Sequence, residues 1–107
     1  MSDYKFVNNS KEILEKSKIA KRRGLEAIGV TAEGHAKENT PVITGRLRNS
    51  ISYAVEDDDV YIGSNVEYAP FVELGARGRK PVHMLRNAAT NHADEYKNIL
   101  QESFENA

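Results

Sequence analysis

The stretch Thr40–Gly75, TPVITGRLRNSISYAVEDDDVYIGSNVEYAPFVELG, decides the fold of this chain. Apolar and polar residues alternate over residues 51–55 and again over 60–64, which is the pattern of half-buried strands. The acidic run Asp57–Asp59 separates the two segments and predicts a hairpin turn. On both sides of the stretch the apolar spacing lengthens to three or four residues. That change of period predicts a helix before the hairpin and another after it.

A short helical turn is predicted just before the hairpin. Thr44–Gly45 reads as a tight turn, and Arg46–Asn49 follows it as the helical turn. Within the return strand, Gly63 predicts a bulge or a close approach of another backbone, because glycine weakens a regular strand. The hairpin is therefore expected to carry one irregularity.

A second short helix is predicted after the hairpin. Pro70 lies early in it, where the missing N–H costs little, and Gly75 lies where a C-terminal cap would fall. Three apolar residues of this segment share one helical face, and we expect them to pack under the hairpin. They are Tyr68, Phe71 and Leu74.

The segment before Pro41 predicts a long helix. Asn9 is suited to be its N-cap, and small or apolar residues then recur every three or four positions to about residue 38. Pro41 ends it, because the residue before a proline is pushed out of the α region. Glycines weaken this helix and allow a kink or break near Gly29. Residues 1–8 are expected to form a loose arm.

A last long helix is predicted to open at Pro81, with an apolar seam from Leu85 to Phe104. Before it, residues 76–81 form a basic, glycine-containing loop that we expect to be mobile. The class is therefore α+β, with a long N-terminal helix, a small antiparallel sheet built on a β-hairpin, a short helix and a long C-terminal helix. At this length, residues 1–107 are expected to form a single domain.

The composition indicates a lean domain without thiol chemistry. Hydrophobic residues make up 39% and charged residues 29%, so we expect partner subunits to complete the core. The absence of cysteine excludes disulfides, thiol catalysis and cysteine metal sites. No apolar run approaches the ~18–20 residues of a membrane span, and the first residues lack the apolar core of a signal peptide. We therefore expect no membrane partner and a cytoplasmic protein that is later assembled elsewhere.

The charges are segregated although the net charge is only −1. Residues 56–75 carry six acids and no basic residue, whereas residues 76–86 carry four basic residues and no acid. Such a separation of acidic and basic segments favours head-to-tail contact between copies, or docking between unlike rings. A duplex-DNA-binding protein would show a clearer basic excess.

No catalytic or metal-binding constellation is evident. His35, His83 and His92 are the only imidazoles, and we expect no HxxxH or HxxE spacing that places two ligands on one helical face. His35 and His92 fall on the apolar seams of different helices, which indicates packed, hydrogen-bonded side chains. The run Asp57–Asp59 lacks the alternating ligands of a calcium loop. We therefore predict no enzyme activity, no cofactor and no small-molecule substrate. A small hydrolase that used His35 or His92 would need a nucleophile or an acid close by, and the sequence does not supply one.

Three ordered motifs resemble those of a known family: TP followed by TGRLRNSI over residues 40–51, YIGSN over 61–65, and YAPFVELG over 68–75. In this order they resemble the tail-component or neck family of tailed bacteriophages typified by gene product ten of phage HK97. The match covers residues 40–75. The residues that carry it are Pro41, Gly45, Leu47, Gly63, Tyr68, Pro70, Phe71, Glu73 and Gly75.

The resemblance implies a non-enzymatic morphogenesis protein that joins, completes or terminates the tail at the head–tail junction or the top of the tail. Such proteins form rings, with six copies the common symmetry. The implied partners are other copies of this chain and neighbouring neck or tail proteins, with a passing contact to DNA in the channel; the implied location is the host cytoplasm, then the virion. We expect contacts at Arg46, Arg48, Asp57, Asp58, Asp59, Arg77, Arg79 and Lys80.

One alternative of a different class stays open. The first helix carries the basic cluster Lys18, Lys21, Arg22 and Arg23, and the 77–80 loop is also basic. Together they could serve a small nucleic-acid-binding module. Salt-dependent binding of the isolated protein to duplex DNA would support this alternative.

Overall fold

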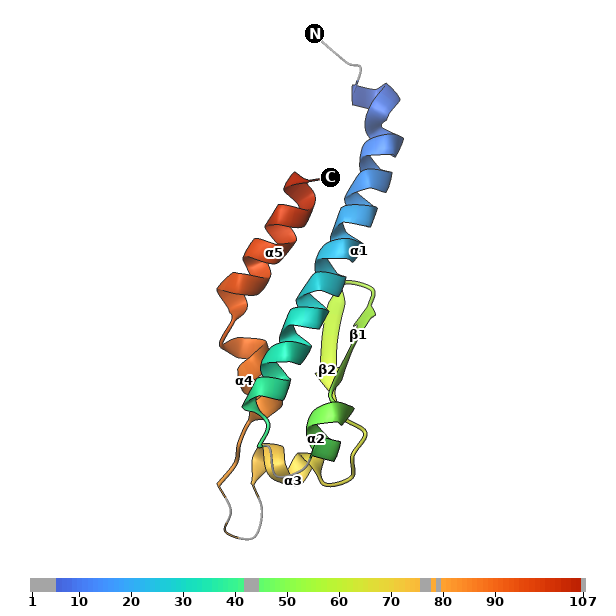
Figure 1. The fold of residues 1–107 in the computed structure, drawn as a ribbon. Helices are drawn as coiled ribbons and strands as arrows, with labels where there is room; N and C mark the ends of the chain where they lie inside the picture. The colour runs from blue at the N-terminus through green and yellow to red at the C-terminus, as the bar shows by residue number, and fades with distance from the viewer. Residues whose placement is uncertain (1–5, 42–44, 76–77, 79, 107) are drawn as a thin grey trace.

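The computed structural model describes residues 6–41, 45–75, 78 and 80–106. The molecule is elongated, with extents of 68 × 22 × 18 Å, and a hairpin and a C-terminal helical arm lie along one long helix (Figure 1). The predicted α+β class is confirmed. The elements are α1 (Phe6–Asn39), α2 (Gly45–Ser50), β1 (Ser52–Glu56), β2 (Asp59–Gly63), α3 (Ala69–Leu74), α4 (Met84–Thr90) and α5 (Ala93–Glu105).

Helix α1 is one continuous helix of 34 residues and not two pieces. It begins at Phe6, so Asn9 lies inside it and the predicted N-cap is wrong, as is the loose arm for residues 6–8; residues 1–5 lie outside the described part. No break occurs near Gly29. An added Cβ at Gly29 would lie 2.3 Å from the Tyr53 ring, so this glycine permits close packing of β1 on the helix.

The end of α1 follows from its sequence, as predicted. Helix α1 stops at Asn39, and Thr40 is buried beside it. The Thr40 hydroxyl donates to the Ala36 carbonyl at 2.7 Å, and its amide donates to the Lys37 carbonyl at 3.2 Å. These bonds satisfy acceptors in the last turn that have no partner further along the helix. Pro41 then directs the chain away from α1.

The hairpin is antiparallel, with Ser52 opposite Gly63 and Glu56 opposite Asp59. Its turn is shorter than predicted, because Asp59 already belongs to β2. The alternating burial of both strands is confirmed: Tyr53 and its neighbours on the same face are half-buried, and the other face is exposed. The prediction for Gly63 is wrong. The ladder is regular up to this residue, and a Cβ there would meet no heavy atom within 4 Å.

Among the described residues, the buried apolar side chains form two small clusters, and Ala20, Leu25 and Ala32 of α1 are buried outside them. One joins α2, α3, α4 and the residue Val66, and the other joins α1, α4 and the residue before β1. Leu85 packs against both and connects them. The clusters contain few large side chains, which agrees with the low apolar content. Their members are Leu47, Val66, Ala69 and Met84 in the first cluster, and Ala36, Ile51 and Ala88 in the second.

The C-terminal helical region starts later than predicted and is divided. Helix α4 begins at Met84 rather than at Pro81, and α5 follows after a break at His92, whose backbone leaves the helical region (φ −122°, ψ 28°). Helix α5 packs on α1, where Ser103 donates to the Ala20 carbonyl at 2.6 Å. Among the helices of the described residues, none has the length and apolar character needed to cross a membrane.

Candidate assembly surface

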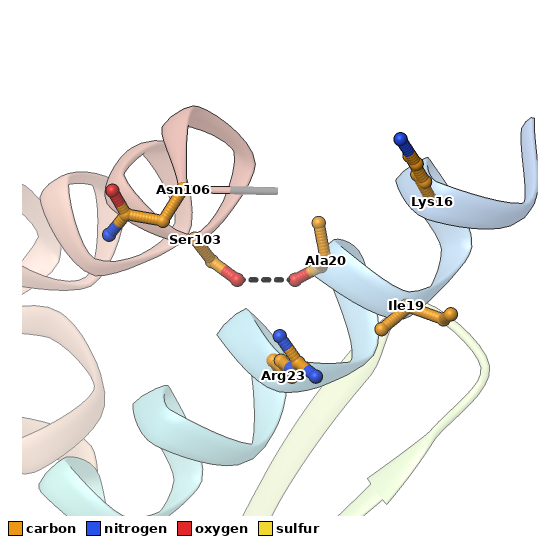
Figure 2. A pocket seen from close by; sticks show the side chains of 6 residues that line it. All are labelled: Lys16, Ile19, Ala20, Arg23, Ser103 and Asn106. Carbon is orange, nitrogen blue, oxygen red and sulfur yellow. Dashed lines mark hydrogen bonds between the residues drawn. The ribbon is translucent and has the colours of Figure 1, made fainter. Parts of the chain in front are cut away.

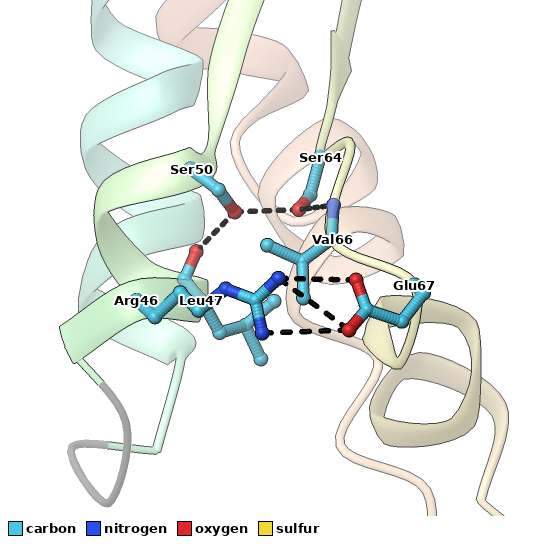
Figure 3. Close-up of polar contacts among 6 residues, drawn as sticks. All are labelled: Arg46, Leu47, Ser50, Ser64, Val66 and Glu67. Carbon is cyan, nitrogen blue, oxygen red and sulfur yellow. Dashed lines mark hydrogen bonds and ion pairs between the residues drawn. The ribbon is translucent and has the colours of Figure 1, made fainter.

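The family-like motifs meet at the end of the hairpin where the strands adjoin α2 and α3 (Figure 3). The Ser50 hydroxyl donates to the Leu47 carbonyl at 2.6 Å, and the Ser50 and Ser64 hydroxyls lie 2.5 Å apart. Ser64 also accepts a hydrogen bond from the Val66 amide at 3.1 Å. This chain of hydrogen bonds ties the end of α2 to the end of β2. The two segments are fourteen residues apart in sequence, so the motifs form one structural unit.

Arg46 and Glu67 form a forked ion pair beside that unit (Figure 3). The closest contact joins Arg46 Nη2 and Glu67 Oε2 at 3.1 Å, and the guanidinium also lies over the Tyr68 ring, 5.7 Å from its centre. The pKa of Glu67 is lowered, first by a backbone hydrogen bond within Glu67 and then by the Arg46 charge. Both side chains are largely exposed. Arg46 is therefore already paired within its own chain but still faces solvent, as does Arg48.

Glu73 links α3 to α4. It is 14% exposed, its Oε1 accepts a hydrogen bond from the Leu85 amide at 2.7 Å, and its Oε2 accepts one from the Arg86 amide at 3.1 Å. His83, the residue at the N-cap position of α4, makes no side-chain cap bond. Glu73, which lies in α3, instead accepts the hydrogen bonds that cap the start of α4. The sequence marks Glu73 only as a motif residue, because nothing local reveals that its partners lie twelve and thirteen positions further on.

The basic loop starts from a fixed base between α3 and α4. The Val82 amide donates to the Val72 carbonyl at 3.0 Å, and the His83 amide donates to the Glu73 carbonyl at 3.1 Å. Gly75 ends α3 as predicted, with φ of 79° that favours glycine. Lys80 is exposed, and Arg77 and Arg79 lie outside the described residues.

Helix α3 turns its bulky apolar side chains to solvent. Phe71 is 62% exposed and Leu74 is 68% exposed, so the prediction that they pack under the hairpin is wrong for both. The buried face of α3 is formed instead by Ala69 and the half-buried Val72. Because these residues are spaced i and i+3, they share one face, and the pair Phe71 and Leu74, two positions further on, points elsewhere. The result is an apolar surface, Phe71 and Leu74, at the base of the basic loop.

The acidic turn lies at the opposite end of the hairpin from α2 and α3 (Figure 1). Asp57, Asp58 and Asp59 are all exposed, and Asp58 forms an ion pair with Lys21 of α1. The pKa of Tyr61 is raised, first by the charge of Asp59. The turn therefore retains a negative character although one of its carboxylates is paired.

The basic cluster of α1 is partly neutralised within the chain. Lys18 pairs with Glu15, Lys21 with the acidic turn, and Arg22 with Glu26. A surface that attracts duplex DNA needs cations that are available to phosphates. The pairs are exposed and do not test the nucleic-acid alternative, which stays a prediction for this cluster.

A small hollow lies between α1 and α5 (Figure 2). Its volume is about 220 Å³. Its wall, as far as the described residues form it, carries two cations, a hydroxyl and an amide, and contains no carboxylate, imidazole or thiol that could serve in acid–base or nucleophilic chemistry. The Ser103 hydroxyl is already committed to the Ala20 carbonyl. The lining residues are Lys16, Ile19, Ala20, Arg23, Ser103 and Asn106.

Two of the three histidines meet, which the sequence does not reveal. His35 of α1 and His92 at the start of α5 stack with ring centres 3.5 Å apart, and His35 Nε2 lies 2.6 Å from Glu95 Oε1. The predicted packed, hydrogen-bonded state of His35 is confirmed. His83 is different, because its Nδ1 is buried without a hydrogen bond, 3.8 Å from Glu73 Oε2.

Comparison with known proteins agrees with the motifs. The family model described as "Bacteriophage HK97-gp10, putative tail-component" matches residues 5–75, which include α1, the hairpin and α3. No curated protein and no solved structure matched the chain. The family match extends over about two thirds of the 107 residues and contains the motif residues of the assembly surface. The protein therefore belongs to the HK97-gp10-like family of bacteriophage tail components.

Proposed function

We propose that this protein is a structural, non-enzymatic component of the phage tail that forms a ring at the head–tail junction or the top of the tail, where it joins, completes or terminates the tail. The observation that carries the proposal is the exposed apolar surface of α3, Phe71 and Leu74, beside the base of the basic loop. Large exposed apolar side chains next to charged residues are typical of protein–protein contacts. Family membership supports the tail as the place of this contact.

The separation of unlike surfaces supports a ring. The acidic turn Asp57–Asp59 and the α3 surface lie at opposite ends of the hairpin, so one face of a copy can meet a different face of the next. Such a head-to-tail contact is heterologous and closes into a ring if the rotation between copies is right. We propose that the acidic turn and the loop residues Arg77, Arg79 and Lys80 lie at contacts between subunits or between rings, with Arg46 and Arg48 at the rim.

The proposed partners are further copies of this chain, with six per ring, and the neighbouring neck or tail proteins. Assembly would begin in the host cytoplasm and end in the virion. A channel through the ring would allow a passing contact between the basic loop and DNA. None of these steps requires a cofactor, a membrane or a small-molecule substrate.

The proposal is tested by replacing both exposed residues of α3, Phe71→Ser with Leu74→Ser, in the phage or particle that encodes the protein. We expect a folded monomer by circular dichroism and particles that lack this chain by mass spectrometry and by cryo-electron microscopy of the junction. Val30→Ser is the matched control, because Val30 is 57% exposed on α1. Wild-type incorporation of the double variant would refute the α3 contact, and absence of wild-type protein from the junction and tail top would refute the location.

A further inference from the structure

Three potential metal ligands from two helices converge where α5 begins. His35 comes from the half of α1 nearest the hairpin, His92 precedes α5, and Glu95 lies in its first turn. One donor atom from each residue lies within 4.8 Å of the other two. His35 Nε2 and His92 Nδ1 are 2.6 Å and 3.7 Å from the same oxygen, Glu95 Oε1. His92 and Glu95 are three positions apart, so the prediction that no HxxE spacing places two ligands on one helical face is wrong. His35 lies more than fifty residues before them, and only the fold brings it close to them.

The distances suit a tetrahedral ion. Metal–ligand bonds of ~2.0–2.2 Å at tetrahedral angles place neighbouring ligand atoms about 3.3–3.6 Å apart. The observed separations bracket this value, so shifts of about an ångström would bring the three atoms to it. Two imidazoles and one carboxylate suit a borderline divalent transition metal such as Zn²⁺, with solvent in the fourth position.

An aromatic side chain lies beside both imidazoles. Tyr96 packs against both rings, with its ring centre 6.4 Å from that of His35 and 6.3 Å from that of His92. The Tyr96 hydroxyl donates to the Ala88 carbonyl, which fixes the ring between α4 and α5. His35 is 20% exposed and Glu95 is 47% exposed, so an ion could enter from solvent on the carboxylate side.

Electrostatics at this position do not forbid a cation. The N-terminus of a helix carries partial positive charge, which opposes cation binding. Asp94 and Glu95, both in the first turn of α5, offset that charge. The two imidazoles supply neutral nitrogen donors once they are deprotonated.

We propose that His35, His92 and Glu95 bind one divalent transition-metal ion of the Zn²⁺ class, which fastens α5 to α1. Binding requires two local changes. The nitrogen of His35 that faces Glu95 must carry no proton, and the rings must turn out of their parallel stack so that their in-plane lone pairs converge on the ion. The interplanar angle is now 1°. The ion would stabilise the contact between α1 and α5, a helix in which no residue is fully buried.

The test uses the full chain, purified without a histidine tag. We expect one equivalent of Zn²⁺ to bind by isothermal titration calorimetry and to raise the thermal midpoint. One equivalent of Co²⁺ should give the intense visible absorption of tetrahedral coordination. His35→Gln and His92→Asn should abolish binding, and Glu95→Gln should weaken it at least tenfold. Asn is a favoured N-cap residue, so His92→Asn keeps the start of α5 supported.

Two controls separate this site from others. Glu102→Gln removes an exposed carboxylate from the same helix, and His83→Asn removes the third imidazole while tolerating its left-handed backbone (φ 47°). Both should bind as the wild type does. Absence of Zn²⁺ and Co²⁺ binding to the wild type would overturn the proposal. Unchanged binding in a folded His35→Gln or His92→Asn variant would do the same.

Discussion

The Glu73 carboxylate of α3 accepts a hydrogen bond from the Leu85 amide at the start of α4, at a distance of 2.7 Å. Its second oxygen accepts one from the Arg86 amide, so one side chain satisfies two amides that have no partner within their own helix. The negative charge also lies at the positive end of α4. The same residue receives the His83 amide on its backbone carbonyl. Glu73 therefore closes the base of the basic loop and fixes α3 against α4.

Replacement of Glu73 by alanine should destabilise the domain by about 1–3 kcal/mol, because the half-buried Leu85 amide and the exposed Arg86 amide of α4 lose their acceptors. Glu73→Gln should cost less, since the amide keeps one acceptor oxygen. Urea unfolding followed by circular dichroism measures both values. Glu102→Ala, on the exposed face of α5, is the control and should stay within about 0.5 kcal/mol of the wild type. An equally small effect of Glu73→Ala would show that the cap is dispensable.

Local sequence patterns predicted only part of this arrangement. Three features depend on residues that are close together in sequence, and the sequence predicts all three. They are the end of α1 at Pro41, the two faces of the hairpin, and the position of Pro70 near the start of α3. The start of α1, the buried face of α3 and the regular backbone at Gly63 were not. In α3 the spacing allows two opposite faces, and only packing of Ala69 against the core selects one.

The candidate site was harder to predict, because its contacts join distant segments. The motif residues of the assembly surface were identified by resemblance, but the partners of Glu73 and Arg46 were not. The pair His35 and His92 illustrates the reason: each looks like an ordinary seam residue on its own helix. Only the break between α4 and α5 and the course of α5 along α1 place them together.

Two glycines of α1 should respond in opposite ways to alanine. A Cβ at Gly29 would lie 2.3 Å from the Tyr53 ring, whereas one at Gly34 would meet nothing within 4 Å. Gly29→Ala should therefore destabilise by about 1–3 kcal/mol through overpacking. Gly34→Ala should stabilise by up to about 1 kcal/mol through helix propensity. Thermal and urea unfolding of the two variants provides the comparison.

A third variant shows whether the Tyr53 ring is the cause. In the background Tyr53→Ala, the added methyl group at Gly29 has space, so Gly29→Ala should no longer destabilise there. The coupling between the two substitutions should then be about 1 kcal/mol or more. Additive effects would mean that β1 and α1 are not packed as closely as described.

Alkaline pH should weaken the fold through Tyr96. The pKa of Tyr96 is raised above its ordinary value of 10.0, first by burial and then by the charge of Glu95. A group whose pKa is raised on folding contributes stability below its unfolded pKa and loses it as pH rises through the folded pKa. Urea midpoints should therefore fall above about pH 10. In Tyr96→Phe this fall should be shallower, because one group with a raised pKa is removed while Tyr53 and Tyr61 keep theirs.

At neutral pH the same variant should cost about 1 kcal/mol, since the hydrogen bond from the Tyr96 hydroxyl to the Ala88 carbonyl is lost. The phenyl ring would still pack against His35 and His92. A Tyr96→Phe variant with unchanged alkaline sensitivity would assign the titration to other groups.

Reversal of the loop charge should impair assembly without unfolding the domain. Arg77 and Arg79 belong to the basic segment that follows the acidic block, and both lie outside the described residues. In Arg77→Glu with Arg79→Glu we expect an unchanged unfolding midpoint, because the bonds of Val82 and His83 to α3 hold the loop base independently. Particle yield and infectivity should fall sharply, because the loop would then repel the acidic turn that we propose as its partner in the next copy.

A second change, Asp57→Lys with Asp59→Lys, restores opposite signs across that contact and should recover assembly in part. Infectious particles at wild-type yield from the loop variant alone would mean that the loop is merely solvated. Failure in both the single and the combined reversal, with folded protein, would place the loop against a different neighbour from the acidic turn.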